Sequence, residues 1–440
     1  MLRVPRRRLV ATAGAVAAAA LVLSGCSTGG AAGSGSTLEL SDKPVTLTVT
    51  WWGSDARAEL TNEAIAAFED EYPNITVEGQ YKDWAGYWDA VATSTAANDS
   101  ADVVQMDEIY LASYADRGAL YDLNQAGDLL DTTSFAEESL AAGQIDGAQY
   151  GVPIGVAAYS IVVNADLFEQ YGVELPDDET WTWDDLAATA QELTDQSGGA
   201  IHGAGNLGGF DTGSVKYWAR SAGGELFDGA GEVTLEPDAL VDLWEFNLGL
   251  IESGAAETAS SMVESFAAGL SAGSLATNKV AIGTAYNTQI TALRAASGQD
   301  LRLLKLPRDG ADNKPDYYKP SMYWSASSQS DHPAEAAAFI DFMLNSDAAT
   351  EILKTERGIP ANTEVRGALE ADLSPDDQLA VDYLNAIDPG TASPLTPNGG
   401  SSIEAIFQRY TQEVYFGQLT PKEAAKAAID EIRGEVDAAA

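Results

Sequence analysis

Cysteine and histidine are nearly absent from this sequence. Of 440 residues, one is cysteine, Cys26, and two are histidine, His202 and His332. A single cysteine excludes an internal disulfide framework, and a chain of this length does not need one because a large hydrophobic core suffices. The two histidines follow no metal-ligand spacing such as H-E-x-x-H, so the sequence predicts neither a metal site nor a cofactor.

Basic residues are also scarce. The chain has 24 Lys and Arg against 67 Asp and Glu, which gives a formal net charge of −43. Such an acidic surface argues against nucleic acid as a partner and against folding onto an anionic bilayer, and solubility is its simplest explanation. A hydrophobic content of 45% with nine tryptophans excludes a disordered chain. The length beyond the leader is enough for two lobes.

The residues before Cys26 have the order of an export signal. Four arginines lie between Arg3 and Arg8, and an uncharged, alanine-rich apolar run extends from Leu9 to Leu23. A membrane-spanning helix needs about 20 apolar residues, and this run is shorter. Its length therefore favours a cleaved signal peptide. The tetrapeptide Leu23 to Cys26 resembles the bacterial lipobox, whose cysteine is acylated and becomes the mature N-terminus. An arginine pair at 6 and 7 leaves general and twin-arginine export open.

Small residues follow the cysteine. The stretch "STGGAAGSGS" cannot form a core, so residues 26–43 are predicted to be a flexible tether that begins at a lipidated Cys26. An inert cysteine inside an ordinary signal peptide is the alternative. The lipoprotein hypothesis anchors the protein, through acyl chains such as palmitate, on the outer face of the cytoplasmic membrane.

Strand and helix signals alternate along the rest of the chain. Val45 to Trp51 is a β-branched apolar run, helix-spaced apolar residues follow from Leu60 to Phe68, and Ile75 to Tyr81 has a second strand pattern. This order predicts a βαβ unit and hence a parallel sheet. The alternation continues with a strand at Val103–Met106 and a long strand-like run at Gly155–Val163. The predicted fold class is α/β.

Several stretches, in this order, resemble one protein family. They are "TLTVTWWGS", "DVVQMDEIYLASYADRGALYDL", "YGVPIGVAAYSIVVNADLFEQYGVELP", "HPAEAAAFIDFMLN" and "ERGIPAN". Together with the lipobox they resemble the bacterial extracellular solute-binding proteins of the sugar-binding, maltose-binding-protein-like group (family 1). The resemblance extends from about Pro44 to Val436. It implies a binding protein, not an enzyme, that delivers solute to the permease subunits of an ABC importer with a separate ATPase.

The resemblance also implies a periplasmic-binding-protein fold, in which crossing hinge segments join two α/β lobes and the ligand lies in the cleft between them. We expect the crossings near Ala157–Ile161, Ile282–Tyr286 and Trp324–Ser328. The expected division is a signal peptide at 1–25, the lipidated cysteine and tether at 26–43, a first lobe of 44–156 plus about 286–324, and a second lobe of 157–285 plus about 325–440.

A carbohydrate site needs aromatic platforms for the C–H faces of the sugar and polar side chains for its hydroxyl groups. In open α/β sheets such groups gather beyond the carboxyl ends of the strands. Trp51 and Trp52 end the first strand on opposite sides, so at most one faces the cleft, with Trp52 slightly favoured. Asp107 and Glu108 follow the Val103–Met106 strand. Asp107 is the favoured carboxylate, and its alternative role is a helix N-cap.

Trp84 opens the helix after the Ile75–Tyr81 strand, and the other candidates lie in the second lobe or near the expected crossings. The alternative to ligand binding is packing in the core for Trp84 and an ion pair with an acidic residue for Arg357. The remaining candidate ligand-binding residues, none of them catalytic, are Trp84, Asp211, Trp218, Tyr286, Asn287, Tyr323, Trp324 and Arg357.

The residues leave more than one function open. We expect a monomeric binding protein whose hinge closes on a carbohydrate, with an oligosaccharide favoured. A polyamine, a peptide or a phosphorylated polyol stays open as the solute. A secreted carbohydrate-active enzyme is the less favoured hypothesis. A glycosidase needs two carboxylates around the scissile bond, and 67 acidic residues make chance pairs unavoidable.

Overall fold

The computed structural model describes residues 38–53, 55–82, 84–308 and 314–439, so the signal peptide and Cys26 lie outside the described residues. Contacts divide the chain into two units, Met1–Ser36 and Thr37–Ala440. The second unit has its own sheets and hydrophobic cores, and we therefore expect it to fold without the leader. In the part of the chain described, no helix combines the length and the apolar character that crossing a membrane requires.

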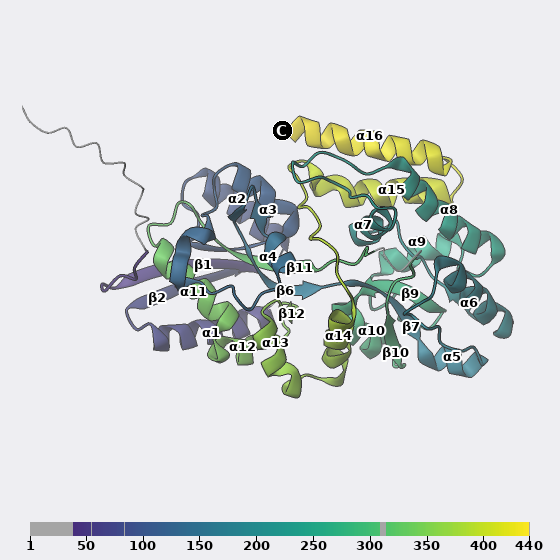
Figure 1. Cartoon of the computed structure of the whole chain (residues 1–440), viewed down its shortest axis with the longest axis horizontal. Coiled ribbons are helices and arrows are strands. Elements are labelled where there is room, and N and C mark those ends of the chain that lie inside the picture. Colours follow the sequence, from purple (N-terminus) through teal and green to yellow (C-terminus); the bar gives the residue numbers. More distant parts are fainter. Residues whose placement is uncertain (1–37, 54, 83, 309–313, 440) are drawn as a thin grey trace, which may run out of the picture. The chain divides into compact units, whose positions relative to one another are not determined.

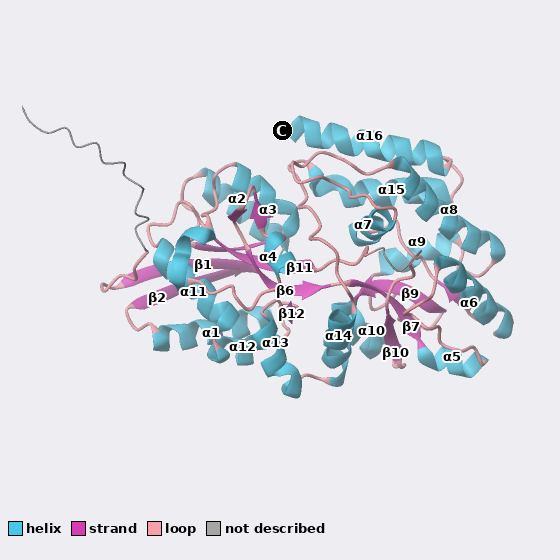
Figure 2. Ribbon diagram, in the orientation of Figure 1, coloured by secondary structure: helices cyan, strands magenta, loops and turns pink. Residues whose placement is uncertain are grey.

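The first lobe is built on a mixed sheet (Figures 1 and 2). Within the described residues the sheet has six strands in the order β12-β6-β11-β3-β1-β2. β1 pairs in parallel with β2 and β3, which confirms the predicted βαβ unit, and β11 is antiparallel to both β3 and β6. The strands are β1 (Val45–Trp52), β2 (Ile75–Lys82), β3 (Val103–Met106), β6 (Val152–Ala157), β11 (Lys319–Ala326) and β12 (Ile359–Pro360).

Helices cover both faces of this sheet. Strand alternation sends Trp51 to the face where it packs with Phe68 and Phe339, and Trp52 to the opposite face, where it packs with Tyr87. The elements of this lobe besides the sheet are α1 (Asp55–Glu71), α2 (Trp84–Ala96), α3 (Glu108–Asp116), η1 (Leu123–Leu129), α4 (Glu137–Ala141), β4 (Gln144–Ile145), β5 (Ala148–Gln149), α11 (Pro333–Asn345), α12 (Asp347–Leu353), α13 (Thr363–Leu369) and η3 (Glu370–Asp372).

The second lobe is built on a smaller sheet. Its four described strands have the order β10-β7-β9-β8, with β7 antiparallel to β9 and β10, and β8 parallel to β9. β8 is short and pairs with β9 from His202 to Ala204, so the far end of β9 has no strand beside it on that edge. The strands are β7 (Tyr159–Asn164), β8 (His202–Ala204), β9 (Val280–Tyr286) and β10 (Leu301–Leu304).

A large core holds the helices of the second lobe. The buried Trp244 of α8 donates its indole N–H to Thr411 Oγ1 of α15 at 2.9 Å, and α16 packs against α8 and α15. The elements of this lobe besides the sheet are α5 (Ala165–Tyr171), α6 (Trp183–Gln196), α7 (Thr212–Ser221), α8 (Pro237–Ser253), α9 (Ala259–Ala268), η2 (Asn287–Gln289), α10 (Ile290–Ser297), α14 (Pro375–Ala386), η4 (Gly400–Ser402), α15 (Ile403–Tyr415) and α16 (Pro421–Ala439).

The chain passes between the two sheets at places that differ partly from the expected crossings. The long strand-like run divides at Ala158 into β6 and β7, which agrees with the first expected crossing. The other two expectations are wrong. β9 stays paired with β7 up to Tyr286, and Trp324 is fully buried in the middle of β11. The second passage lies between β10 and β11, and the third lies between η3 and α14.

Sheet membership therefore differs from the expected division of the chain. β10 belongs to the second sheet because it pairs with β7, although its residues fall inside the range expected for the first lobe. β12 belongs to the first sheet because it pairs with β6, although its residues fall inside the range expected for the second lobe. Neither pairing can be deduced from strand pattern alone, since pattern gives a strand but not its partner.

The first crossing is fixed by a buried amide. Asn287 Oδ1 accepts from the Ala158 N–H at 2.8 Å, and Asn287 Nδ2 donates to the Ala380 carbonyl at 2.8 Å. One hydrophobic cluster runs past this point and includes Trp51 in the first lobe and Leu301 in the second. The crossing is thus surrounded by buried side chains, as in a hydrophobic core.

Candidate functional site

A buried ion pair joins the two lobes. Lys216 Nζ of α7 lies 2.5 Å from Glu108 Oε1 of α3, and the two side chains are 4% and 11% exposed. Glu108 is the first residue of α3, directly after the N-cap Asp107, whose carboxylate accepts from the Ile109 N–H at 3.1 Å. The alternative N-cap role of Asp107 is thereby observed, at the carboxyl end of β3.

Further charged groups and phenols surround this ion pair. Lys319 attracts both Asp107 and Glu108, and its ammonium lies 5.8 Å from the ring centre of Tyr286. The Lys216 ammonium lies 5.9 Å from the ring centre of Tyr317. We call this group the interlobe cluster; its members are Asp107, Glu108, Asp211, Lys216, Tyr286, Tyr317, Lys319 and Glu404.

Burial controls the protonation of the carboxyl groups in the interlobe cluster. It raises the pKa of Asp107 and Asp211, and burial together with repulsion from Asp211 raises the pKa of Glu404. Burial acts in the same direction on Glu108, but attraction to Lys216 and Lys319 outweighs it and holds the pKa of Glu108 below its ordinary value. Glu108 is therefore the carboxylate most firmly charged.

Asp211 is held in place by its own helix. Its carboxylate accepts from the Ser214 N–H at 2.8 Å, which caps α7, and from the Tyr159 hydroxyl at 3.0 Å. The ring of Tyr159 lies edge-on to Tyr286, with ring centres 5.3 Å apart. The first turn of α7 thus brings Asp211 and Lys216 to the surface that faces α3.

Aromatic rings form a second surface on the first lobe. Trp84 is 42% exposed and lies edge-on to Trp52, with ring centres 5.0 Å apart. Trp84 also neighbours Trp88, with ring centres 5.6 Å apart, and Tyr110 of α3, with ring centres 6.3 Å apart. Burial raises the pKa of Tyr110, and the charge of Asp107 raises it further. Trp88 supports these rings from the core. The exposed Trp84 is thus one ring away from the first turn of α3.

Several candidate residues instead lie in the cores. Trp51 and Trp324 are fully buried in the hydrophobic cluster that runs past the crossing. Tyr323 is fully buried, and its hydroxyl donates to the Ala142 carbonyl at 2.7 Å. Asn287 fixes the crossing, as described above. Trp218 stacks on Trp183 of α6, with ring centres 4.5 Å apart.

Strand alternation explains the burial of Trp51, Tyr323 and Trp324. An aromatic residue near the end of a strand has one side facing the core, and only tertiary packing decides which. Asn287 is buried in η2, and Trp218 of α7 is partly buried against the core of the second lobe.

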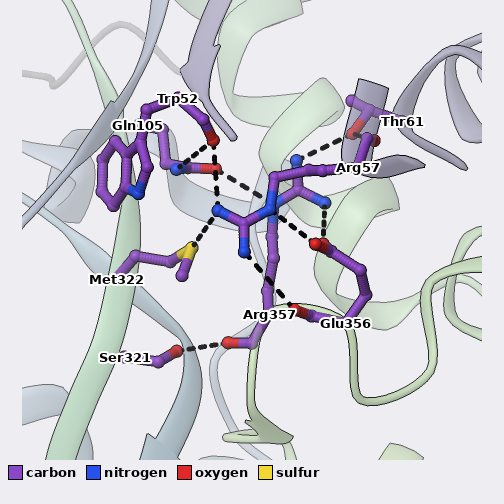
Figure 3. A network of polar contacts seen from close by, with 8 residues as sticks. All are labelled: Trp52, Arg57, Thr61, Gln105, Ser321, Met322, Glu356 and Arg357. Carbon is purple, nitrogen blue, oxygen red and sulfur yellow. Dashed lines mark hydrogen bonds and ion pairs between the residues drawn. The ribbon is translucent and has the colours of Figure 1, made fainter. Parts of the chain in front are cut away.

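Arg357 is also directed into the first lobe (Figure 3). Its guanidinium donates to Gln105 Oε1 at 3.0 Å and to Thr61 Oγ1 at 2.8 Å, and it pairs with Glu356 at 3.1 Å. Burial, which leaves the residue 3% exposed, lowers its pKa to about 9. The alternative of pairing with an acid is observed, and the guanidinium does not reach the interlobe cluster.

The Arg357 network positions the loop before β12. Arg57 of α1 reaches the same Glu356 at 2.6 Å and donates to the Trp52 carbonyl at 3.1 Å (Figure 3). Ser321 of β11 donates to the Arg357 carbonyl. Helix α1, the ends of β1 and β3, and β11 are therefore tied together next to the aromatic surface of Trp52.

Little space remains between the lobes at the ion pair. A cavity of about 10 Å³, lined in part by Glu108, Lys216 and Tyr317, has room for about one water molecule. A saccharide cannot enter without separation of α3 from α7. The ion pair must then break or be replaced by contacts to the ligand.

Sequence reasoning missed four residues of the interlobe cluster: Lys216, Tyr317, Lys319 and Glu404. Lys216 lies five positions after Asp211, and in a chain with 24 basic residues a lysine so close to a candidate carboxylate is a usable signal. Tyr317 lies just before β11 and Lys319 is its first residue, whereas the aromatic residues of that strand favoured Tyr323 and Trp324. Their position became evident only from the passage between β10 and β11.

One string in the sequence matches a catalytic pattern. Gly269 to Gly273 reads G-L-S-A-G, the G-x-S-x-G of serine hydrolases. That pattern activates its serine when it forms a tight turn from a strand into a helix. Here it follows α9, and Ser271 is exposed in a loop, so the required turn is not formed. In the described ranges, no group of three or more His, Cys, Asp or Glu residues is arranged to hold a metal ion.

Comparison with known proteins identifies the class of this two-lobed chain. Residues 63–380 match the family described as bacterial extracellular solute-binding protein. The match covers more than half of the chain, so the protein belongs to this family, and the predicted family and two-lobed α/β fold are confirmed. Members of this family are binding proteins rather than enzymes, and they serve ABC transporters.

Individual relatives agree with this class. An extracellular solute-binding protein of family 1 from Alicyclobacillus acidocaldarius is similar with a TM-score of 0.74 and 25% identity, over 90% of this chain and 99% of that one. A periplasmic oligogalacturonide binding protein from Yersinia enterocolitica has a TM-score of 0.77 and 23% identity over the same shares of the chains.

A lipoprotein is among the relatives. An uncharacterised lipoprotein of Streptomyces antibioticus is 26% identical over 370 residues, which is 80% of this chain and 76% of that protein. The match to the first curated relatives, binding proteins of Brucella, is shorter: at 27% identity it spans 46% of their length.

The ion pair between Glu108 and Lys216 predicts a measurable change in the distance between the lobes. Removing one partner of a buried pair leaves the other charge unpaired and costs about 3–5 kcal/mol. Glu108→Gln is therefore expected to favour lobe separation at pH 7, seen as a larger radius of gyration by small-angle X-ray scattering. The exposed pair Lys426–Asp430 gives the matched control, because Asp430→Asn should leave the radius unchanged.

The same pair predicts the direction of the pH dependence. The pKa of Glu108 lies below its ordinary value of 4.5, so the pair stabilises the closed arrangement above that pH and the contribution is lost as pH falls through the lowered pKa. The difference in radius between wild type and Glu108→Gln should shrink as the pH falls below 4.5 and through the lowered pKa. Identical radii at pH 7 would contradict a role for this pair in closure.

Proposed function

We propose that the protein is the substrate-binding component of an ABC importer for an uncharged carbohydrate, with an oligosaccharide favoured, and that it catalyses no reaction. The observation that carries the proposal is the interlobe cluster. It combines phenol rings and carboxylates of the kind that bind sugar hydroxyl groups, and it draws them from both lobes of a solute-binding fold.

The aromatic surface supports the carbohydrate assignment. Trp84 is an exposed ring supported by Trp52 and Tyr110, and a supported ring offers a platform at low entropic cost. Trp84, Trp52, Asp107, Glu108, Asp211 and Tyr286 are the original candidates that we retain for the ligand site, with Lys216, Tyr317 and Lys319 added.

Charge favours an uncharged ligand over an acidic one. Among the described residues of the interlobe cluster, four are carboxylic acids and two are lysines, and one lysine is already paired with Glu108. A uronate would bring further negative charge close to Asp107 and Asp211. The Yersinia relative binds oligogalacturonide, but at its level of identity the likeness concerns the fold alone.

The same excess of carboxylates favours a second candidate, a cationic solute such as a polyamine. An ammonium group could take the position of the Lys216 ammonium beside Glu108. A polyamine has no hydroxyl groups for the phenols of Tyr286 and Tyr317, and for this reason we rank it second.

Closure follows from the geometry of the crossing. The packed side at Ala158 acts as the hinge, and the polar side at Glu108 and Lys216 separates and closes on the ligand. In the ligand-bound form the contacts of both lobes to one molecule would replace the direct ion pair. Such a form is what the permease subunits would recognise.

Calorimetric titration of residues 37–440 tests the proposed ligand class. We expect micromolar or tighter binding of one class of uncharged oligosaccharide, with at least about tenfold weaker binding of a uronic acid oligosaccharide of the same length and no breakdown of the bound sugar. Asp107→Asn should weaken binding of the uncharged sugar. Asp430→Asn, which changes an exposed carboxylate of α16 paired with Lys426, is its control.

Other outcomes would redirect the assignment. Binding of spermidine in place of any sugar would favour the cationic solute. Tighter binding of the uronate would contradict the charge argument. Slow cleavage of the bound oligosaccharide would contradict the absence of catalysis.

We propose further that Cys26 carries the lipid that anchors the protein to the outer face of the cytoplasmic membrane. The signal order before Cys26 and the lipoprotein relative support this proposal. Cells expressing the full chain and fed radioactive palmitate should yield labelled protein in the membrane fraction, and Cys26→Ser should be unlabelled. Label in the Cys26→Ser protein, or none in the wild type, would contradict the anchor.

A further inference from the structure

A second and much larger cavity lies inside the second lobe. It has a volume of about 390 Å³, within the range of sites for small molecules, and its lining residues all come from elements of that lobe. It is bounded by α9, the loop after α9, the free end of β9 and the start of α10. It is therefore distinct from the small space between α3 and α7.

Apolar side chains form one part of the wall of this cavity, and polar side chains, among them Asn206, Glu257 and Ser274, form another. Phe266 is 44% exposed at its rim, with its ring centre 5.1 Å from that of Phe210, and Leu270 is also exposed there. Exposed apolar side chains that gather at one place on a protein surface often mark a binding site. Here they gather at the rim of a cavity. The apolar lining residues include Phe210, Met262, Phe266, Leu270, Leu275 and Leu293.

The cavity exists because a strand ends early. β8 stops at Ala204, and the Gly205 N–H makes the last bond to β9, at the Ile282 carbonyl, 2.9 Å away. Backbone groups of alternate residues point to the same edge of a strand, so Thr284 presents its N–H and C=O to the side that β8 has left. Thr284 lines the cavity. The wall thus offers a hydrogen-bonding edge beside apolar surface.

The cavity shares one wall with the interlobe cluster. Tyr159, Asp211 and Tyr286 line it, and the last two belong to the cluster as defined above. The Lys319 ammonium, which does not line the cavity, lies over the ring of Tyr286 at 5.8 Å from its centre. A molecule that contacts Asp211 and Tyr286 at the cluster therefore lies next to the cavity.

We propose that this cavity binds an aryl or alkyl group, and that the transported ligand is a carbohydrate that carries such a group. The second part rests on the proposed function. A plain sugar does not suit the cavity, because each hydroxyl group buried against Phe210, Met262 or Leu293 would lose its hydrogen bonds to water. A phenyl ring or short alkyl chain gains free energy from the same surface. The polar edge at Thr284 and Asp211 suits the glycosidic end.

The test uses N-phenyl-1-naphthylamine, a neutral apolar fluorophore, with residues 37–440. We expect saturable binding of one probe molecule per protein, with increased fluorescence. Phe266→Ala should weaken this binding about tenfold by removing one wall of the rim. Phe416→Ala is the matched control, because Phe416 is a similarly exposed ring, 50% against 44%, at the end of α15 and outside the cavity.

Displacement of the probe then tests the link to carbohydrate. Phenyl β-D-glucopyranoside should displace the probe at a concentration at least about tenfold below that of methyl β-D-glucopyranoside, and Phe266→Ala should reduce this ratio.

Each contrary outcome is distinct. No saturable probe binding, or equal weakening by Phe266→Ala and Phe416→Ala, would overturn the cavity as a site. Equal displacement by the phenyl and methyl glucosides would overturn the aryl or alkyl ligand. Probe binding that depends on Phe266, together with silence of every saccharide in calorimetry, would instead contradict the proposed function and leave the apolar site standing.

Discussion

The arrangement of this molecule depends on the ion pair between Glu108 and Lys216. Buried charges are tolerated where they are paired, and these two come from different lobes, so the pair exists only when the lobes meet. The crossing at Ala158, by contrast, is packed by a continuous hydrophobic cluster with a buried amide. Separating that packing would expose apolar surface to water, whereas a polar contact can be exchanged for ligand contacts. This difference makes the crossing the hinge and the ion pair the contact that opens.

The surroundings of the pair follow from helix starts. Asp107 and Asp211 each cap a helix, α3 and α7, and the caps bring the first turns of both helices to the same space. Carboxylates used as caps are held in one rotamer, which suits them to recognise hydroxyl groups. The Arg357 network likewise fixes elements of the first lobe, because its hydrogen bonds connect the ends of β1 and β3 to α1 and β11.

Much of the fold could be predicted from the sequence, because alternating strand and helix patterns with clear caps are local signals. The βαβ unit and β3 came from such signals, and the first crossing at Ala158 was expected from the resemblance to the family. The other crossings could not, because the pairing of β10 with β7 is decided by tertiary contacts. For the same reason Trp324 and Arg357 were placed at the site, although burial directs both into the first lobe, and Lys216 was missed, since its partner lies 108 positions away.

The most direct test of the central claim is hydrogen exchange of residues 37–440, read by mass spectrometry, with and without the saccharide that binds best in calorimetry. The account predicts added protection in the first turn of α3 and in the first turn of α7, because one ligand contacts both lobes. Protection confined to one lobe, with the other unchanged, would contradict closure of the two lobes on a shared ligand.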